Sequence, residues 1–407
     1  MKKIILLSVL LTLSSIQLFA QTPSAYSVFN IGLKNELFST RSVGLSMGAI
    51  TIDDPDYLNQ SNPAAMTNLE LTKIEVFANG NSTFISDKLN TKQIKSFEVG
   101  GLALAFPLSK SNGVSLLLGV SPYTKSNFKV SSQQYINPEF GTGTTEIDVI
   151  GGLNDLHIAS SWNAFYGIHI GAAYHYLFGN SKFVTKTSFS NTFFDYSEFT
   201  RSYEDRGSYY AVGLIFPQFN LGDISDIKFG LTLDTKALIK SDYFADRKSS
   251  AVDDTTEKVS SDYNIPAKIT AGLSFRFLSD YRGMVEYSSQ EWDSYNNLSK
   301  MNIDAYKRFS GAVEYRPYKE TNFDFSKAVY RIGFSFEQLP LYINSQNINQ
   351  TTLSIGASYP ISYQNHIDLG LAFGTRGETT NGNLKEKFVR FSLGLSLGEL
   401  WFTQQDR

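Results

Sequence analysis

The chain has 407 residues, a formal net charge of −3 at pH 7 and no cysteine. The lack of cysteine excludes a disulfide scaffold, a thiolate metal site and a lipoprotein anchor on cysteine. The nearly balanced charge, 36 basic against 39 acidic residues, leaves no basic surface for nucleic acid, so no nucleic-acid partner is expected.

Residues 1–20 have the pattern of a secretory signal peptide. Lys2 and Lys3 form a positive start, the apolar run IILLSVLLTL follows, and the segment ends in LFA, which predicts cleavage after Ala20. Beyond this point no apolar run approaches the ~18 residues that a transmembrane helix needs. A secreted chain so rich in Tyr (23), Phe (31) and Gly (30) is typical of an outer-membrane barrel.

Residues 21–70 do not alternate between apolar and polar side chains. Small residues, short helical turns and an Asn-Pro pair indicate a compact plug rather than strands. The acidic run DDPD at residues 53–56 lacks the spaced ligands of a calcium loop, so a solvated turn is predicted there.

Residues 71–407 alternate with a period of two, which is the signature of β-strands. Near the C-terminus, apolar side chains from Val389 to Trp401 share one parity, whereas Arg390 and several small residues share the other. In a transmembrane barrel the apolar face meets lipid, and Gly and Ser make room in the lumen. We therefore predict an all-β chain: a transmembrane antiparallel β-barrel of about 14 strands, an even number, with the plug inside its lumen.

The third predicted strand, residues 112–136, contains a proline. Pro122 cannot donate to the strand ladder, so pairing is expected to fail beside Ser121 and Pro122. The alternative is that Pro122 marks the outer rim, where a strand ends without consequence.

Two stretches, GLSMG at 44–48 and GLSLG at 394–398, match the G-x-S-x-G elbow that presents the nucleophilic serine of many esterases. The elbow requires a strand-to-helix turn, but Ser396 lies on the lumenal parity of a regular strand with no helix after it. We therefore expect packing roles for Ser396 and Ser46 and no enzymatic activity. A serine–histidine pair formed across strands stays open as an alternative.

The four histidines do not predict a metal site. His169 and His175 share the lumenal face of one strand, but six residues of extended chain separate them too far for one ion. We expect neither a metal nor another cofactor.

Three stretches carry a resemblance to a known family: RSVGLSMGA at 41–49, NPAAM at 62–66 and the closing FVRFSLGLSLGELWF. In these stretches the chain resembles the FadL/TodX outer-membrane transporters of hydrophobic compounds. The resemblance implies a fourteen-stranded barrel (71–407) plugged by an N-terminal hatch (21–70), with an irregular third strand that opens the wall sideways. A break beside Ser121 and Pro122 needs hatch residues or water to satisfy its backbone groups. The candidate partners are the first residues after the signal peptide and the turn of Asn62, Pro63 and Ala64, so these residues are predicted to lie along the route.

Several charged side chains fall on the lumenal parity, and four arginines are singled out: Arg276, Arg308, Arg331 and Arg390. An arginine that faced lipid at mid-bilayer would cost about 2–4 kcal/mol, so these side chains are expected inside. They form either a structural ion-pair network that holds the plug or part of a track for carboxylate head groups.

The sequence thus predicts a protein of the Gram-negative outer membrane that takes up hydrophobic, fatty-acid-like compounds passively through a plugged barrel with a lateral opening. The alternative is a non-transport barrel subunit or scaffold of an outer-membrane secretion or protein-assembly complex. Expected partners are outer-membrane lipid and lipopolysaccharide, hydrophobic small molecules and, under the alternative, other envelope proteins.

Overall fold

The computed structural model describes residues 24–28, 32–191, 193–249, 253–255, 258–292, 304–317, 327–362 and 364–400. The predicted signal peptide, residues 1–20, lies outside the described residues. Among the residues described, no helix is both long enough and apolar enough to cross a membrane.

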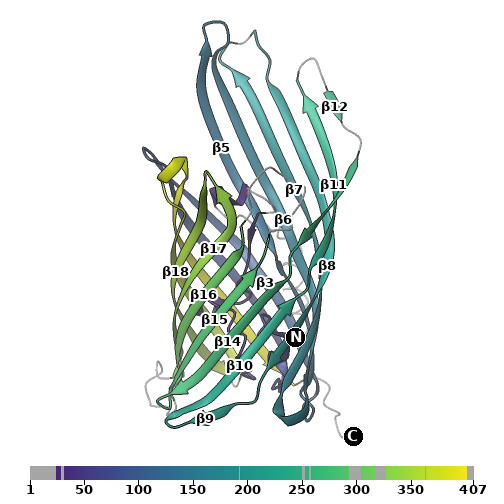
Figure 1. The fold of residues 1–407 in the computed structure, drawn as a ribbon, viewed down its shortest axis with the longest axis vertical. Helices are drawn as coiled ribbons and strands as arrows, with labels where there is room; N and C mark the ends of the chain where they lie inside the picture. Colours follow the sequence, from purple (N-terminus) through teal and green to yellow (C-terminus); the bar gives the residue numbers. More distant parts are fainter. Residues whose placement is uncertain are drawn as a thin grey trace, which may run out of the picture.

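The described strands form one antiparallel sheet that closes on itself, because β2 pairs with β20 (Figure 1). Twenty strand segments make fourteen barrel strands, which confirms the predicted number. Three barrel strands consist of two segments each (β4 and β5, β10 and β11, β13 and β14), while β1, β9 and β12 are short additions. The bounds are β1 Leu33–Lys34, β2 Thr72–Ser86, β3 Thr91–Ser109, β4 Val114–Pro122, β5 Thr124–Asn137, β6 Gly141–Asn163, β7 His169–Phe189, β8 Ser197–Ile215, β9 Phe219–Leu221, β10 Ile224–Asp234, β11 Ala237–Lys248, β12 Asp253–Thr255, β13 Val259–Ile265, β14 Lys268–Phe277, β15 Tyr281–Gln290, β16 Tyr306–Tyr315, β17 Val329–Ile343, β18 Gln346–Ser362, β19 Asn365–Arg376 and β20 Lys385–Glu399.

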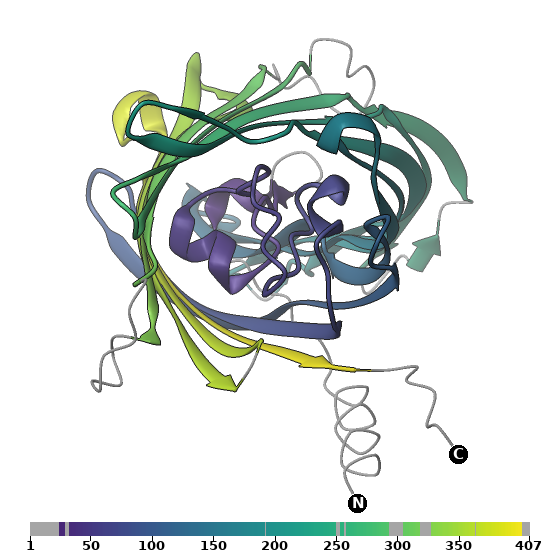
Figure 2. The same ribbon diagram turned by 90° about the horizontal axis from the view of Figure 1, so that it is seen from below.

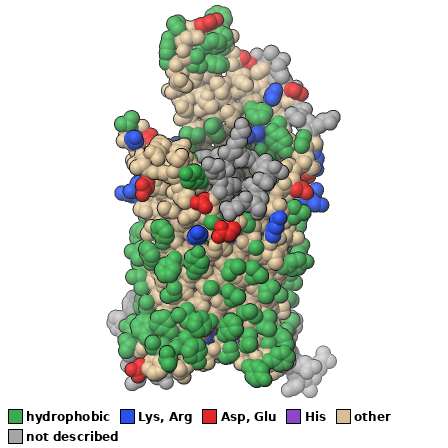
Figure 3. Space-filling model, viewed as in Figure 1, with side chains coloured by type: hydrophobic (Ala, Val, Ile, Leu, Met, Phe, Trp, Pro, Cys, Tyr) green, Lys and Arg blue, Asp and Glu red, His purple; other side chains and the backbone are tan. Residues whose placement is uncertain are grey.

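The strands form where apolar and polar residues alternate, because successive side chains of a strand point to opposite faces. In β17, Arg331 and Ser335 are buried in the lumen, whereas Phe334 and Phe336 lie on the outer face. Repeated around the barrel, this pattern gives the apolar surface that covers the lower wall in Figure 3. The chain is therefore an outer-membrane β-barrel.

The described residues between 24 and 71, here called the lumenal segment, lie inside the barrel (Figure 2). They include three short helices: η1 (Ala25–Val28), α2 (Thr40–Leu45) and η2 (Pro63–Met66). The side chain of Ser39 caps α2 by accepting a hydrogen bond from the Ser42 amide, and Asn62 caps η2 in the same way through the Ala64 amide. Helix α2 packs against β16 to β20.

One side of the barrel is much taller than the other, because β5, β6, β7, β8 and β11 continue beyond the remaining strands (Figure 1). Turns such as η3 (Phe165–Gly167) close the opposite end, and η5 (Thr380–Gly382) joins β19 to β20. The polar sequence near residues 80–93 predicts a long, outward-facing connection, but these residues are mostly strand, and Ser86 pairs with Thr91. That prediction was wrong because Asn81 and Thr83 continue the polar lumenal face of β2 rather than a loop.

Candidate functional site

The barrel wall is interrupted between β3 and β5. The ladder that joins β3 to β4 ends where Leu102 pairs with Val120, and β4 itself ends at Pro122. From Gly101 toward Thr91, β3 pairs with β2 alone among the described strands. The strand after Pro122, β5, pairs with β6 and with the lumenal strand β1. Beyond Pro122 the wall strand thus no longer pairs with β3, and it pairs with β1 of the lumenal segment instead.

Two local features produce this break. Pro122 has no amide hydrogen to donate, so the ladder loses a bond at that residue. On the opposite strand, Gly151 and Gly152 adopt φ values of 133° and 128°, which side chains rarely tolerate. A side chain on Gly152 would collide with the backbone of Thr124. The proline therefore acts together with a glycine pair that the sequence analysis missed.

The lumenal segment satisfies the backbone groups that the break exposes. The Asn35 amide donates to the Tyr123 carbonyl at 2.8 Å, and the Asn35 side chain donates to the Pro122 carbonyl at 3.3 Å. The Tyr123 amide donates to the Leu153 carbonyl at 2.8 Å. Such partners are required because an unsatisfied backbone group in hydrocarbon costs several kcal/mol.

The break lies at a depth where the outer surface is still apolar. Pro122 pairs with Asn154 of β6, and two outward-facing residues of β6, Ile150 and Leu156, lie on either side of Asn154. Both are exposed to the surroundings of the barrel. The break therefore opens toward the lipid-facing surface rather than above it.

Two adjoining cavities lie inside the break. The first, of about 50 Å³, is lined by Pro63, Tyr209 and the acidic and histidine side chains of β6 and β7. The second, of about 40 Å³, has a more apolar lining from Trp292, Tyr306 and other side chains. Lys34, Glu36 and Tyr123 line both.

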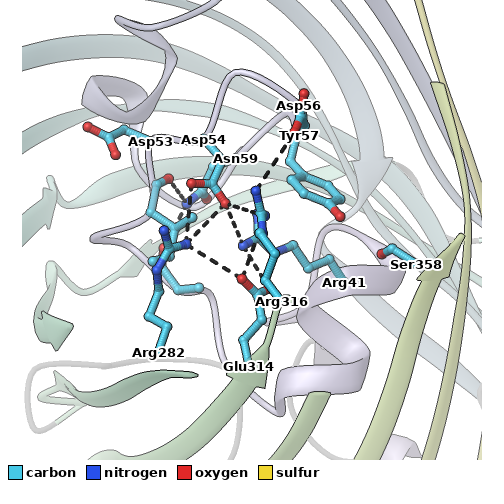
Figure 4. Close-up of polar contacts among 12 residues, drawn as sticks. Arg41, Asp53, Asp54, Asp56, Tyr57, Asn59, Arg282, Glu314, Arg316 and Ser358 are labelled. Atoms are coloured by element: carbon cyan, nitrogen blue, oxygen red, sulfur yellow. Dashed lines mark hydrogen bonds and ion pairs between the residues drawn. The ribbon is translucent and has the colours of Figure 1, made fainter. Parts of the chain in front are cut away.

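A buried cluster of ion pairs holds the lumenal segment to the opposite wall (Figure 4). Asp54 of the lumenal segment and Glu314 of β16 share the arginines Arg41, Arg282 and Arg316, at distances between 2.9 and 3.7 Å. Arg331 adds a bond to Glu314 at 2.8 Å and one to the Tyr57 hydroxyl at 2.9 Å. Burial would raise the pKa of Asp54, but the arginines outweigh burial and hold that pKa well below its usual range.

Comparisons with known proteins agree with this architecture. A protein-family model, BamG, matches residues 1–406. The chain belongs to the BamG family. Among solved structures, a FadL homologue of Pseudomonas aeruginosa is similar with 12% identity, covering 90% of this chain and 99% of that one, at a TM-score of 0.61. A search of curated protein sequences found no significant match.

Two further structures share the fold. The toluene transporter TodX of Pseudomonas putida has 13% identity and a TM-score of 0.58, and covers 89% of this chain and 98% of its own. The CymD monoaromatic hydrocarbon channel has 14% identity and a TM-score of 0.55, and covers 92% of this chain and 100% of its own. The family and these structures confirm the resemblance noted in the sequence and the outer-membrane barrel fold.

The structure distributes the residues singled out in the sequence over different regions of this BamG-family barrel. Ser121 and Pro122 border the wall break. Asn62 instead donates to the Leu214 carbonyl of β8, and Ala64 packs against Ile215, so neither caps the break. Pro63 packs against the wall at Gly171 of β7 and Gly213 of β8, and it also lines the first cavity.

The four predicted lumenal arginines have separate roles. Arg308 donates to the Ser46 carbonyl of the lumenal segment, and Arg331 joins the ion-pair cluster. Arg390 donates to Asn81 on a neighbouring strand. Arg276 lies near the β14–β15 turn, paired with Asp226 and outside the cluster.

The acidic run at 53–56 forms a turn, as predicted, with the Tyr57 amide donating to the Asp54 carbonyl, but the side chains of Asp53 and Asp54 are largely buried rather than solvated. Asp54 is the centre of the ion-pair cluster, and Asp53 binds Lys228 at 2.6 Å and lies 3.3 Å from His169. Except for Arg41, the ion-pair partners of this run lie on or beside wall strands more than a hundred positions away, which no local pattern indicates.

Ser396 is fully buried, as expected for a packing role. It lies opposite His366 in the β19–β20 ladder, but neither the Ser396 hydroxyl nor His366 Nδ1 has a hydrogen-bond partner among the described residues. Ser396 and His366 are therefore neighbours across the two strands, but no hydrogen bond joins the serine hydroxyl to the imidazole.

Replacing Gly213 by valine is expected to lower the free energy of unfolding by about 1–3 kcal/mol, because overpacking a tight contact costs that much. A side chain at Gly213 would collide with the Asn62 side chain and approach Pro63 within 2.9 Å. Urea unfolding in detergent measures the change. Gly80→Val is the matched control, because no described atom lies within 4 Å of the added carbon; an equal loss in both variants would contradict the prediction.

Proposed function

We propose that this barrel takes up hydrophobic, fatty-acid-like compounds passively across the outer membrane, and that they leave the lumen sideways through the wall break. The observation that carries the proposal is the interrupted ladder at Pro122, which the lumenal segment fills and behind which two cavities adjoin. The fold supports it, since two solved structures with this fold are described as a toluene transporter and a monoaromatic hydrocarbon channel.

The route runs from the apolar cavity beside Trp292 and Tyr306, past Tyr123, into the cavity bordered by Pro63, and out beside Ser121 and Pro122. A third cavity of about 70 Å³, lined by Arg308, Arg376 and Arg390, adjoins Lys34 and Glu36 and offers positive charge to a carboxylate head group. Lys34 and Glu36 of the lumenal segment line all three cavities, and β1 fills the break, so passage requires a movement of the lumenal segment.

Residues 32–36 fill the break and are held there by strand β1, by two hydrogen bonds of Asn35 and by the ion pair of Glu36 with Lys268 at 2.7 Å. Strand β1 contributes two residue pairs to β5, and each backbone hydrogen bond has a net worth of about 0.5–1.5 kcal/mol. Helix α2 is attached to the opposite wall through the buried ion pairs of Arg41 and through its packing against β16 to β20. We therefore propose that residues 32–36 move aside during uptake while α2 stays in place.

Replacing Pro122 by valine is expected to slow uptake several-fold without unfolding the barrel, because residue 122 regains an amide donor and the gap beside β3 narrows. The rate at which liposomes containing the purified protein take up a fluorescent fatty acid measures this. Pro107→Val is the control, since Pro107 lies within the paired part of β3. Unchanged uptake in Pro122→Val, or no uptake above that of empty liposomes for the wild type, would count against the proposal.

A second candidate function is a non-transport subunit or scaffold of an outer-membrane assembly or secretion complex. Two observations favour it: the ion pairs fix the lumenal segment, and the tall strands β5 to β8 carry exposed apolar side chains at their far end, including Tyr135, Ile136 and Phe193. A barrel that acts alone has no evident need for this exposed apolar surface.

Purification from native membranes in mild detergent separates the two candidates. A scaffold is expected to retain other envelope proteins at a fixed ratio, and to lose them when Tyr135 and Ile136 are replaced by serine. A transporter is expected to purify with lipid or lipopolysaccharide as its partners, and to keep its uptake rate in that double variant.

A further inference from the structure

Three side chains with metal-binding chemistry meet on the lumenal face of the wall. Asp155 and His157 lie on β6, and His175 lies directly opposite His157 on β7. His175 Nδ1 is 2.8 Å from Asp155 Oδ2, and His157 Nδ1 is 3.4 Å from the same oxygen. One ligand atom from each residue lies within 4.8 Å of the other two.

Hydrogen bonds account for only part of this cluster, because His175 Nδ1 and Asp155 Oδ2 are bonded to each other whereas other atoms have no partner among the described residues. His157 is 4% exposed, yet neither of its ring nitrogens has a hydrogen-bond partner among the described residues. Asp155 Oδ1 is also buried without a partner there. Buried polar atoms are normally satisfied, because each one left unpaired costs about 1–3 kcal/mol. A ligand that accepts electron pairs from both rings and from the carboxylate would satisfy them together.

We propose that Asp155, His157 and His175 bind a divalent transition-metal ion of the zinc type. Two imidazole nitrogens and a carboxylate oxygen are typical ligands of Zn²⁺, with bonds of about 2.0–2.2 Å. Ca²⁺ and Mg²⁺ do not suit this set, because they prefer oxygen ligands throughout. A bound ion would replace the hydrogen bond between His175 Nδ1 and Asp155 Oδ2, and side-chain rotations would bring the ligand atoms, now within 4.8 Å of one another, to bonding distance.

The neighbourhood supports the same conclusion. The His175 ring stacks on Tyr209, with centroids 4.3 Å apart, which fixes the orientation of a ligand as outer groups do in metal sites. Gly119, opposite His157 on β4, has no side chain, and any side chain there would collide with the His157 ring. All three side chains line the first cavity, from which a further ligand could reach a bound ion.

Gln60 of the lumenal segment lines the same cavity and lies near His157, since a carbon added at Gly119 would be 3.2 Å from Gln60 Oε1 and 2.3 Å from His157 Nε2. The Gln60 Oε1 atom has no hydrogen-bond partner among the described residues. A bound ion that Gln60 also ligates would connect the wall to the lumenal segment. The ladder neighbour of Asp155 is Ser121, so the ion would lie beside the wall break. The site does not depend on the proposed transport function.

Zinc titration of the full mature barrel in detergent, after treatment with a chelator, tests the proposal by calorimetry. One ion per barrel is expected to bind with micromolar or tighter affinity. His157→Gln and His175→Gln, each tested alone, are expected to weaken binding at least tenfold, since glutamine preserves side-chain polarity and removes the imidazole ligand. His169→Gln is the matched control, because His169 is a lumenal histidine on the same strand as His175, and should bind as the wild type does.

Cobalt supplies a second readout that does not depend on affinity. Co²⁺ bound by two imidazoles and a carboxylate gives visible absorption bands of low-symmetry coordination, which are expected in the wild type and His169→Gln and lost in His157→Gln. Absence of zinc binding by the wild type overturns the proposal. Equal binding by all four proteins overturns it too, because the ion would then sit elsewhere.

Discussion

Replacing Glu314 by glutamine is expected to destabilise the folded barrel by about 3–5 kcal/mol, the usual cost of removing one partner from a buried ion pair. Glu314 is 1% exposed and binds or approaches four arginines. Without its charge, Arg41 and Arg282 keep only Asp54 as an acidic partner in the cluster, and Arg316 keeps Asp54 and Asp56. Urea unfolding in detergent micelles, followed by tryptophan fluorescence, measures the loss.

Glu146→Gln provides the control for this prediction. Glu146 also pairs with a cation, Lys129 at 3.3 Å, but the two side chains are 41% and 59% exposed. Exposed pairs contribute about 0–1 kcal/mol, so this variant should unfold nearly as the wild type does. If Glu314→Gln and Glu146→Gln behaved alike, the cluster in Figure 4 would not hold the lumenal segment in place.

The barrel could be predicted from the sequence because its signal is local. Period-two alternation is repeated in every strand, so errors at single boundaries hardly change the number of strands. The break at Pro122 could also be predicted locally, because the missing amide donor is a property of proline itself. Residues 80–93 show where this local signal fails. A strand that continues beyond the lipid no longer needs an apolar outer face. Its sequence is then polar on both faces and resembles that of a loop.

The contacts of the lumenal segment could not be predicted because they are not local. Asp54 and Glu314 share arginines although 260 positions separate them, and their meeting depends on how the segment folds inside the barrel. The same holds for His157 and His175, which the register between β6 and β7 places opposite each other. Comparing histidines within one strand, as the sequence allows, pairs His169 with His175 and misses the closer partner.

A disulfide between residue 34 and residue 124 is expected to abolish uptake while it is oxidised. Lys34 of β1 pairs with Thr124 of β5 beside the wall break, and antiparallel partners lie about 4.5–5.5 Å apart, within the span of a disulfide. The Lys34→Cys, Thr124→Cys variant would therefore hold residues 32–36 in the break. Because the natural chain has no cysteine, no other disulfide competes. Fatty-acid uptake by liposomes, measured before and after reduction, shows whether the block is reversible.

The control crosslinks two wall strands instead. Ser115 and Ser161 are ladder partners on β4 and β6, with their hydroxyls 2.6 Å apart, so a disulfide there constrains no lumenal residue. This variant should take up fatty acid at the wild-type rate in either redox state. If the 34–124 crosslink forms and uptake continues, β1 is not the moving part and the lateral route through the break is excluded. If oxidation blocks uptake and reduction restores it, the lumenal segment is a gate, because only its attachment to the wall differs between the two states.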